Sequence, residues 1–118
     1  MHITTIDANI VSALERPDRL QALGSDSHLR SLTDMLRRNG PLQTIAFLTS
    51  KKSENLLAAL QAGLTAIPGH PRVPLEVRAL ARLATGDLLA LSQRLTRVAV
   101  WLNRLVEATA VAPEATHP

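Results

Sequence analysis

Residues 87–108 read DLLALSQRLTRVAVWLNRLVEA, and this stretch decides the fold. Its apolar residues recur at alternating steps of three and four, and they form a seam along one helix face: Leu88, Leu91, Leu95, Val98, Leu102 and Leu105. A heptad seam of this length is typical of a helix that packs along most of its length. We predict a helix over 87–110, about 36 Å long at 1.5 Å per residue. The pattern does not decide whether the seam faces a core or a partner.

Apolar residues at helical spacing also mark the segments before this helix. Thr4 or Thr5 is placed to cap a first helix, and Pro17 suits the first turn of a short second helix that Gly24 would end. Asp26 is placed to cap a third helix, whose apolar face carries Leu29, Leu32 and Leu36.

Asn39 and Gly40 predict a left-handed end to this third helix, and Pro41 the start of the next one. Ser53 either caps a further helix or lies inside a continuous one, whose apolar stripe carries Leu57, Leu60, Leu64 and Ile67. The stretch PGHPRVP, residues 68–74, predicts the longest loop because its three prolines cannot lie inside a helix. We expect a helix to restart near Pro74, with a bend or cap at 85–87.

These patterns predict an all-α fold, a compact single-domain bundle of about five to seven helices. A length of 118 residues is typical of one domain, and a chain of this size buries roughly 65% of its unfolded surface. We place the bundle at 1–110 and expect 111–118 to form a flexible C-terminal tail.

The composition argues against an enzyme. The chain has no cysteine, so it offers no thiolate ligand or nucleophile. The four histidines are scattered and lack the spacing of metal ligands: His2, His28, His70 and His117. The acidic residues are spread singly, and no phosphate-binding glycine loop or nucleophile elbow occurs. We therefore expect no catalytic residues, no metal and no cofactor.

The charge permits contact with nucleic acid. Eleven arginines and two lysines against ten acids give a net charge of +3. Only Phe47 and Trp101 are aromatic, so base stacking on aromatic platforms is not expected, and any contact would run through phosphates. The N-terminus lacks the pattern of a signal peptide, and no segment approaches the roughly 20 apolar residues of a membrane span. We expect a cytoplasmic protein without membrane contact.

Two basic pairs flank the apolar run in RRNGPLQTIAFLTSKK, residues 37–52: Arg37 with Arg38, and Lys51 with Lys52. One interpretation is structural, because cations are favourable at helix C-termini. The other is that both pairs contact RNA backbone or a neighbouring subunit, roughly 20 Å apart if 41–52 is one helix.

A second group of cations lies beside the seam of the last helix. Arg94, Arg97 and Arg104 fall with Trp101 within about 80° of arc at 100° per residue. Such a stripe would suit a phosphate backbone or an acidic partner. Alternatively, Trp101 packs between helices and the arginines extend around the edge of the core.

The stretch MLRRNGPLQTIAFLTSKK, Met35–Lys52, resembles the signature of the small α-helical subunit of the CRISPR type III-B (Cmr) effector complex. In that family a helix ends at Asn-Gly, and the next helix carries an Ala-Phe-Leu core followed by Ser-Lys. The stretch 87–108 is similar to a family helix with a Trp-Leu-x-Arg step, here Trp101, Leu102 and Arg104. The resemblance covers about residues 25–110.

This resemblance implies a non-catalytic subunit in antiviral defence. It would stack along a ribonucleoprotein filament and touch the backbone and large subunits, further copies of itself, and the guide and target RNA. The isolated chain would be a monomer or weakly self-associating. A different function stays open from the residues alone: a helical protein–protein adaptor or chaperone that binds no nucleic acid and presents the seam to its partner.

Overall fold

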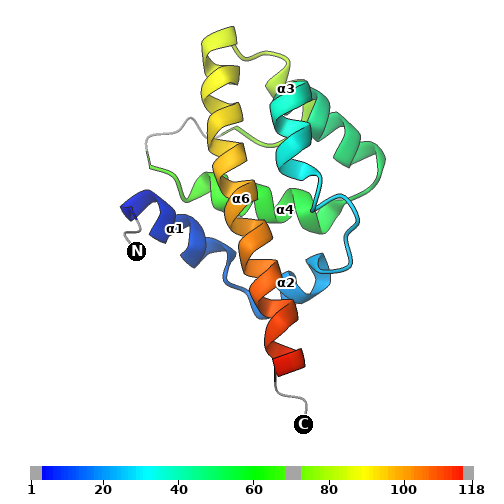
Figure 1. Ribbon diagram of the computed structural model, residues 1–118. Coiled ribbons are helices and arrows are strands. Elements are labelled where there is room, and N and C mark those ends of the chain that lie inside the picture. The colour runs from blue at the N-terminus through cyan, green and yellow to red at the C-terminus, as the bar shows by residue number, and fades with distance from the viewer. Residues whose placement is uncertain (1–3, 69–72, 116–118) are drawn as a thin grey trace.

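The longest helix, α6 (Thr85–Ala115), runs along the whole molecule in this computed structural model, which describes residues 4–68 and 73–115 (Figure 1). Its seam faces inward. Leu91, Leu95, Val98 and Leu102 are completely buried, and Leu88 and Leu105 pack half-buried against the same core. The seam is therefore part of the core, which answers the question that the spacing left open.

Six helices make up the described residues, and no strand occurs among them: α1 (Thr5–Leu14), α2 (Pro17–Leu23), α3 (Leu32–Ser50), α4 (Glu54–Thr65), α5 (Val77–Leu80) and α6. The predicted all-α bundle is confirmed. Figure 1 shows α6 crossing the other helices, and α1, α2, α3 and α4 all pack against it, while α5 packs against α3.

The first two helices begin as the sequence predicts. The Oγ1 atom of Thr4 accepts a hydrogen bond from the backbone N–H of Asp7 at 3.1 Å, which caps α1. Pro17 is the first residue of α2, where its missing N–H costs no helical hydrogen bond. Ile10 and Leu14 of α1 and Leu20 and Leu23 of α2 are buried in the core.

Helix α3 consists of two halves joined at Gly40. This glycine has φ 80° and ψ 173°, a conformation that residues with a side chain rarely adopt. Pro41 then begins the second half, and the two halves point in different directions (Figure 1). The end predicted at Asn39 and Gly40, and the restart at Pro41, are confirmed.

The predicted start of the third helix is wrong. Helix α3 begins at Leu32, so Leu29 lies before it. The Oδ1 atom of Asp26 accepts a hydrogen bond from the N–H of His28 at 2.8 Å. A side-chain oxygen that bonds the backbone two residues ahead stabilises a turn rather than a helix. Leu29 is nevertheless buried in the core.

Two later boundaries were also predicted only approximately. Helix α4 begins directly after Ser53, whose side chain makes no capping hydrogen bond, and α5 begins at Val77 rather than at Pro74. The side chain of Gln61 holds the chain before α5, because its Oε1 accepts from the N–H of Leu75 at 2.8 Å. Of the predicted loop 68–74, residues 69–72 lie outside the described residues. Helix α6 continues to Ala115, into the range expected to be a tail.

Helices α4 and α6 approach each other closely at Gly63. A Cβ atom built on this buried glycine would lie 2.5 Å from Cγ1 of Val98, well inside van der Waals contact. The absence of a side chain at position 63 therefore sets how near the two helices lie.

We predict that Gly63→Ala destabilises the protein by about 1–3 kcal/mol through overpacking, although alanine favours helices. Gly86→Ala is the matched control, because a Cβ there meets nothing within 4 Å and should be neutral or stabilising by up to about 1 kcal/mol. Urea denaturation measures both. In a Val98→Ala background the Gly63→Ala cost should shrink by about 1 kcal/mol or more. Additive effects of the two changes would contradict the close approach.

Thr44 carries a buried hydroxyl that lacks a hydrogen-bond partner among the described residues. Other helical threonines donate to the carbonyl four residues earlier: Thr49, Thr65, Thr96 and Thr109. For Thr44 that residue is Gly40, whose non-helical backbone turns its carbonyl out of the helical direction. The break in α3 therefore explains why this hydroxyl is unpaired.

We expect Thr44→Val to be neutral or to stabilise the protein by up to about 1 kcal/mol, because it removes an unpaired polar group without changing the shape of the side chain. Thr96→Val is the control, since Thr96 Oγ1 donates to the carbonyl of Ser92 at 2.8 Å, and losing that bond should cost about 0.5–1 kcal/mol. Thermal unfolding monitored by circular dichroism compares the two. A larger loss for Thr44→Val would show that its hydroxyl is paired.

Candidate nucleic-acid interface

Exposed cations lie at both ends of the second half of α3. Arg37 and Arg38 are exposed just before the break at Gly40, and Lys51 and Lys52 are exposed just after Ser50. The half-helix 41–50 is about 15 Å long. Its buried residues, including Ile45 and Leu48, hold it in the core while the cations stay in water.

Only one of these four cations has an acidic partner in the part of the chain that the structure describes. Arg38 Nε lies 3.3 Å from Asp34 Oδ2, one turn earlier on α3, and the two side chains are 76% and 59% exposed. Ion pairs in such an exposed setting contribute roughly 0–1 kcal/mol and are screened by salt. Arg38 therefore remains accessible to an anionic ligand.

Lys51 belongs to a small aromatic cluster formed with His28 and Phe47. The Phe47 ring meets the His28 ring edge-on, with centroids 5.0 Å apart, and Lys51 Nζ lies 5.7 Å from the Phe47 centroid. A cation at this distance from a ring is attracted to its electron-rich face. Lys52 adopts a left-handed backbone conformation with φ 56° directly after Lys51, the residue that caps the end of the helix.

The arginine stripe predicted on α6 is divided by the structure. Arg97 is bound to Asp7 of α1: its Nε lies 2.6 Å from Oδ1, and its Nη2 lies 3.1 Å from Oδ2. Trp101 donates from Nε1 to the same Asp7 Oδ1 at 3.0 Å. Asp7 thus joins α1 to α6, and the charge of Arg97 is neutralised within the fold.

The other two arginines of the stripe have different surroundings. Arg104 is exposed, and its guanidinium carbon lies 5.4 Å from the centroid of the Trp101 ring. Arg94 is half-buried and lines a cavity of about 280 Å³ together with Arg97 and apolar residues such as Ile6 and Ile67. Of the three, Arg104 is therefore the most accessible to a ligand.

The Asp7 carboxylate is held in its charged form. The hydrogen bond from Arg97 keeps the pKa of Asp7 far below its usual range, with smaller contributions from Trp101 and Thr4, while burial acts in the opposite direction. A lowered folded-state pKa stabilises the fold above the unfolded value near 3.8, and this stabilisation is lost as the pH falls below that value.

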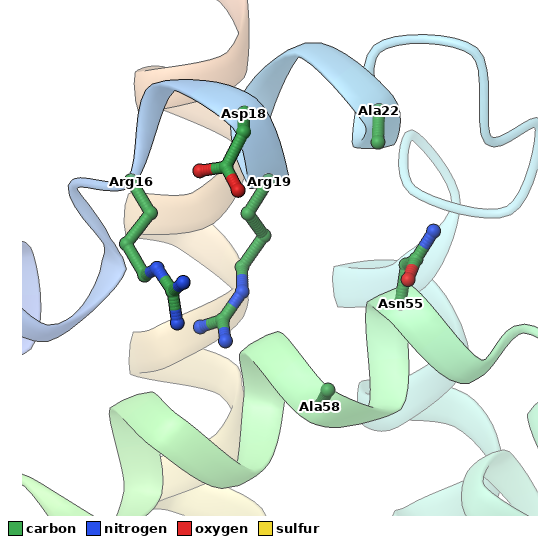
Figure 2. A pocket seen from close by; sticks show the side chains of 6 residues that line it. All are labelled: Arg16, Asp18, Arg19, Ala22, Asn55 and Ala58. Atoms are coloured by element: carbon green, nitrogen blue, oxygen red, sulfur yellow. The ribbon is translucent and has the colours of Figure 1, made fainter.

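A further basic site was not predicted. Arg16, just before α2, and Arg19, within it, line a cavity of about 270 Å³ that also borders α4. Figure 2 shows the two guanidinium groups side by side, directed toward α4. Two arginines three residues apart at the start of the predicted second helix were the available signal, but only the packing of α2 near α4 shows that the two side chains border a cavity.

Two further properties concern the described residues. In 4–68 and 73–115, no group of three His, Cys, Asp or Glu side chains is arranged to hold a metal ion. No helix in these ranges has the combined length and apolar character needed to cross a bilayer.

No protein-family model, curated protein or solved structure matches the chain. The function is therefore argued from the residues and from their geometry. The main candidate surface consists of the four cations that flank the second half of α3, which we call the α3 basic pairs: Arg37, Arg38, Lys51 and Lys52. Arg104 and the cavity at Arg16 and Arg19 lie on other elements.

We predict that Asp7→Asn destabilises the protein by about 1–3 kcal/mol at pH 7, because the substitution weakens charge-assisted hydrogen bonds to Arg97. The difference from the wild type should shrink as the pH falls below about 4, because the carboxylate of the unfolded wild-type chain then takes up a proton, whereas the folded one stays charged until a much lower pH. Denaturation curves at pH 7, 5 and 3 measure this effect. Asp34→Asn removes an exposed partner of Arg38 and should change stability by only a few tenths of a kcal/mol. Equal effects of the two substitutions, or a constant Asp7→Asn effect at all three pH values, would contradict this role.

Proposed function

We propose that the chain is a non-catalytic small subunit of a CRISPR type III-B (Cmr) effector complex that contacts RNA backbone and neighbouring subunits in antiviral defence. The observation that carries the proposal is the set of α3 basic pairs. They are exposed, they flank one half-helix whose inner face is buried, and only Arg38 has an acidic partner within the described residues. A rigid half-helix with cations at both ends suits a ligand with regularly spaced negative charges.

The two segments that resemble the family support the proposal because they form the main helices of the fold. Met35–Lys52 covers most of α3 and the residues after it, and 87–108 lies within α6. These two helices pack against each other. The resemblance thus concerns residues that build one continuous part of the molecule, together with the cations on its surface.

The spacing of the basic pairs suits a single-stranded RNA. The half-helix between them is about 15 Å long, so one subunit would neutralise phosphates at two points along an RNA strand. Contacts of this kind do not read the base sequence, which in RNA-guided complexes is read by base pairing. Arg104 is a further RNA contact in this proposal. Arg94 lies at the edge of the cavity of about 280 Å³ that it lines. Arg97 is excluded as an RNA contact, because Asp7 already neutralises its charge.

The adaptor function is less well supported. An adaptor would have to present the seam of α6 to a partner, but four of the six seam residues are completely buried within this chain. A partner could reach them only if the bundle opened. No observation on the described residues favours this function over the RNA-contacting one.

Charge reversal tests the proposal. We expect Arg37→Glu/Arg38→Glu and Lys51→Glu/Lys52→Glu each to weaken RNA retention by the assembled complex and to flatten its salt dependence, by roughly 0.7 in the logarithmic slope for each phosphate that is no longer neutralised. Arg78→Glu/Arg82→Glu is the control, because it changes the net charge equally at two exposed residues of another region. A salt titration of RNA binding by reconstituted complexes measures all three.

Helical content should remain unchanged in these variants, because the substituted side chains are exposed. An affinity and a salt slope equal to those of the control variant would remove the α3 basic pairs from the RNA path. A nuclease-controlled pull-down that retains neither RNA nor CRISPR-associated proteins would refute the proposed function as a whole.

A further inference from the structure

The cavity between α2 and α4 combines a concave shape with positive charge. Its lining comprises two arginines, one aspartate, one asparagine and two alanines: Arg16, Arg19, Asp18, Asn55, Ala22 and Ala58. In Figure 2 the two guanidinium groups lie on one side, and the side chain of Asn55 lies on the other. The small side chains of Ala22 and Ala58 leave the space between them open.

Neither arginine forms an ion pair with another residue that the structure describes. The ion pairs found among those residues are Arg38 with Asp34 and Arg97 with Asp7. Two guanidinium groups that lie side by side repel each other. Yet Arg16 and Arg19 extend in the same direction rather than apart (Figure 2). An anion between them would remove this repulsion.

The size and the charge of the cavity restrict the ligand. A volume of about 270 Å³ lies just below the roughly 300–1,000 Å³ of pockets that enclose a whole small molecule. The cavity thus suits one charged group of a larger ligand. The two arginines and Asp18 together carry a charge of +1. One phosphodiester, with a charge of −1, balances this charge, whereas a phosphomonoester with a charge of −2 would leave the site negative.

Donor geometry also favours a phosphodiester over a carboxylate. A guanidinium presents a planar set of N–H donors that matches two oxygens at once. One guanidinium therefore satisfies a carboxylate, whereas two guanidinium groups and an amide offer donors to oxygens that point in several directions. The non-bridging and bridging oxygens of a phosphodiester are arranged in this way.

We propose that this cavity binds one phosphodiester group of a single-stranded RNA backbone, with Arg16 and Arg19 as the principal contacts and the Asn55 amide as an additional donor. The site deepens the proposed function and rests on it. Helix α2 packs near the C-terminal part of α6, where Gly24 lies close to Val106. Arg16 and Arg19 belong to α2 and the residue before it, so they would give the subunit a contact with RNA beyond the α3 basic pairs.

The test is an NMR titration of the isotope-labelled full chain with a single-stranded uridine dodecamer. We expect the Arg16 and Arg19 Nε–H signals and the Asn55 side-chain amide signals to shift on addition of the RNA. Parallel titrations use inorganic phosphate and a peptide of six glutamates at the same charge concentration. The method detects weak binding, so an absence of shifts is informative.

Two variants separate the cavity from the net charge. Arg16→Gln/Arg19→Gln should weaken RNA binding about tenfold more than Arg78→Gln/Arg82→Gln, which removes two charges elsewhere, and should lower the logarithmic salt slope by roughly 0.7 more. Ala58→Leu fills the cavity without changing any charge, and its position is exposed, so the fold should tolerate it. This variant should lose the Asn55 shift while its circular dichroism spectrum stays that of the wild type.

Each remaining outcome overturns the site. Shifts at Lys51 and Arg38 without shifts at Arg16, Arg19 and Asn55 would refute the cavity but leave the proposed function intact. No shifts at any basic residue would refute both for this chain. Shifts produced by inorganic phosphate or by the glutamate peptide, but not by the dodecamer, would assign the cavity to a small oxyanion or to an acidic protein segment instead.

Discussion

The rest of the structure depends on the burial of the α6 seam. Four other helices pack against α6, and each contributes residues to the core that the seam completes. Completely burying a leucine or valine side chain contributes about 1.5–3 kcal/mol relative to leaving it exposed, so the seam is a large part of the driving force for assembly. The missing side chain at Gly63 lets α4 lie close to this seam.

The same constraint determines where the charges lie. Once α6 is enclosed, the arginines beside its seam have either a partner within the fold or contact with water. Arg97 binds Asp7 and fastens α1, whereas Arg104 covers one face of Trp101 and stays exposed. The second half of α3 buries its apolar residues in the core. The cations at its two ends therefore stay at the surface.

The proposed function rests on how charge is distributed over the resulting surface. The α3 basic pairs and the α2–α4 cavity lie on different elements, and both would bind phosphate rather than read bases. In a filament of such subunits, the α3 basic pairs would contact one stretch of the RNA strand and the α2–α4 cavity would contact another. In this proposal the positions of the positive charges matter more than the net charge of +3.

Local patterns were enough to predict the fold class, a cap at Thr4 or Thr5, the break at Gly40 and the α6 helix, because each depends on residues within a few turns of one another. Contacts between distant residues could not be predicted in this way. Asp7 and Arg97 are 90 positions apart, and only the packing of α1 on α6 brings them to 2.6 Å. Likewise, only the position of α2 over α4 makes a cavity of Arg16, Arg19 and Asn55. Helical periodicity reports which face of a helix is apolar, but the neighbour of that face is decided when all the helices compete for one core.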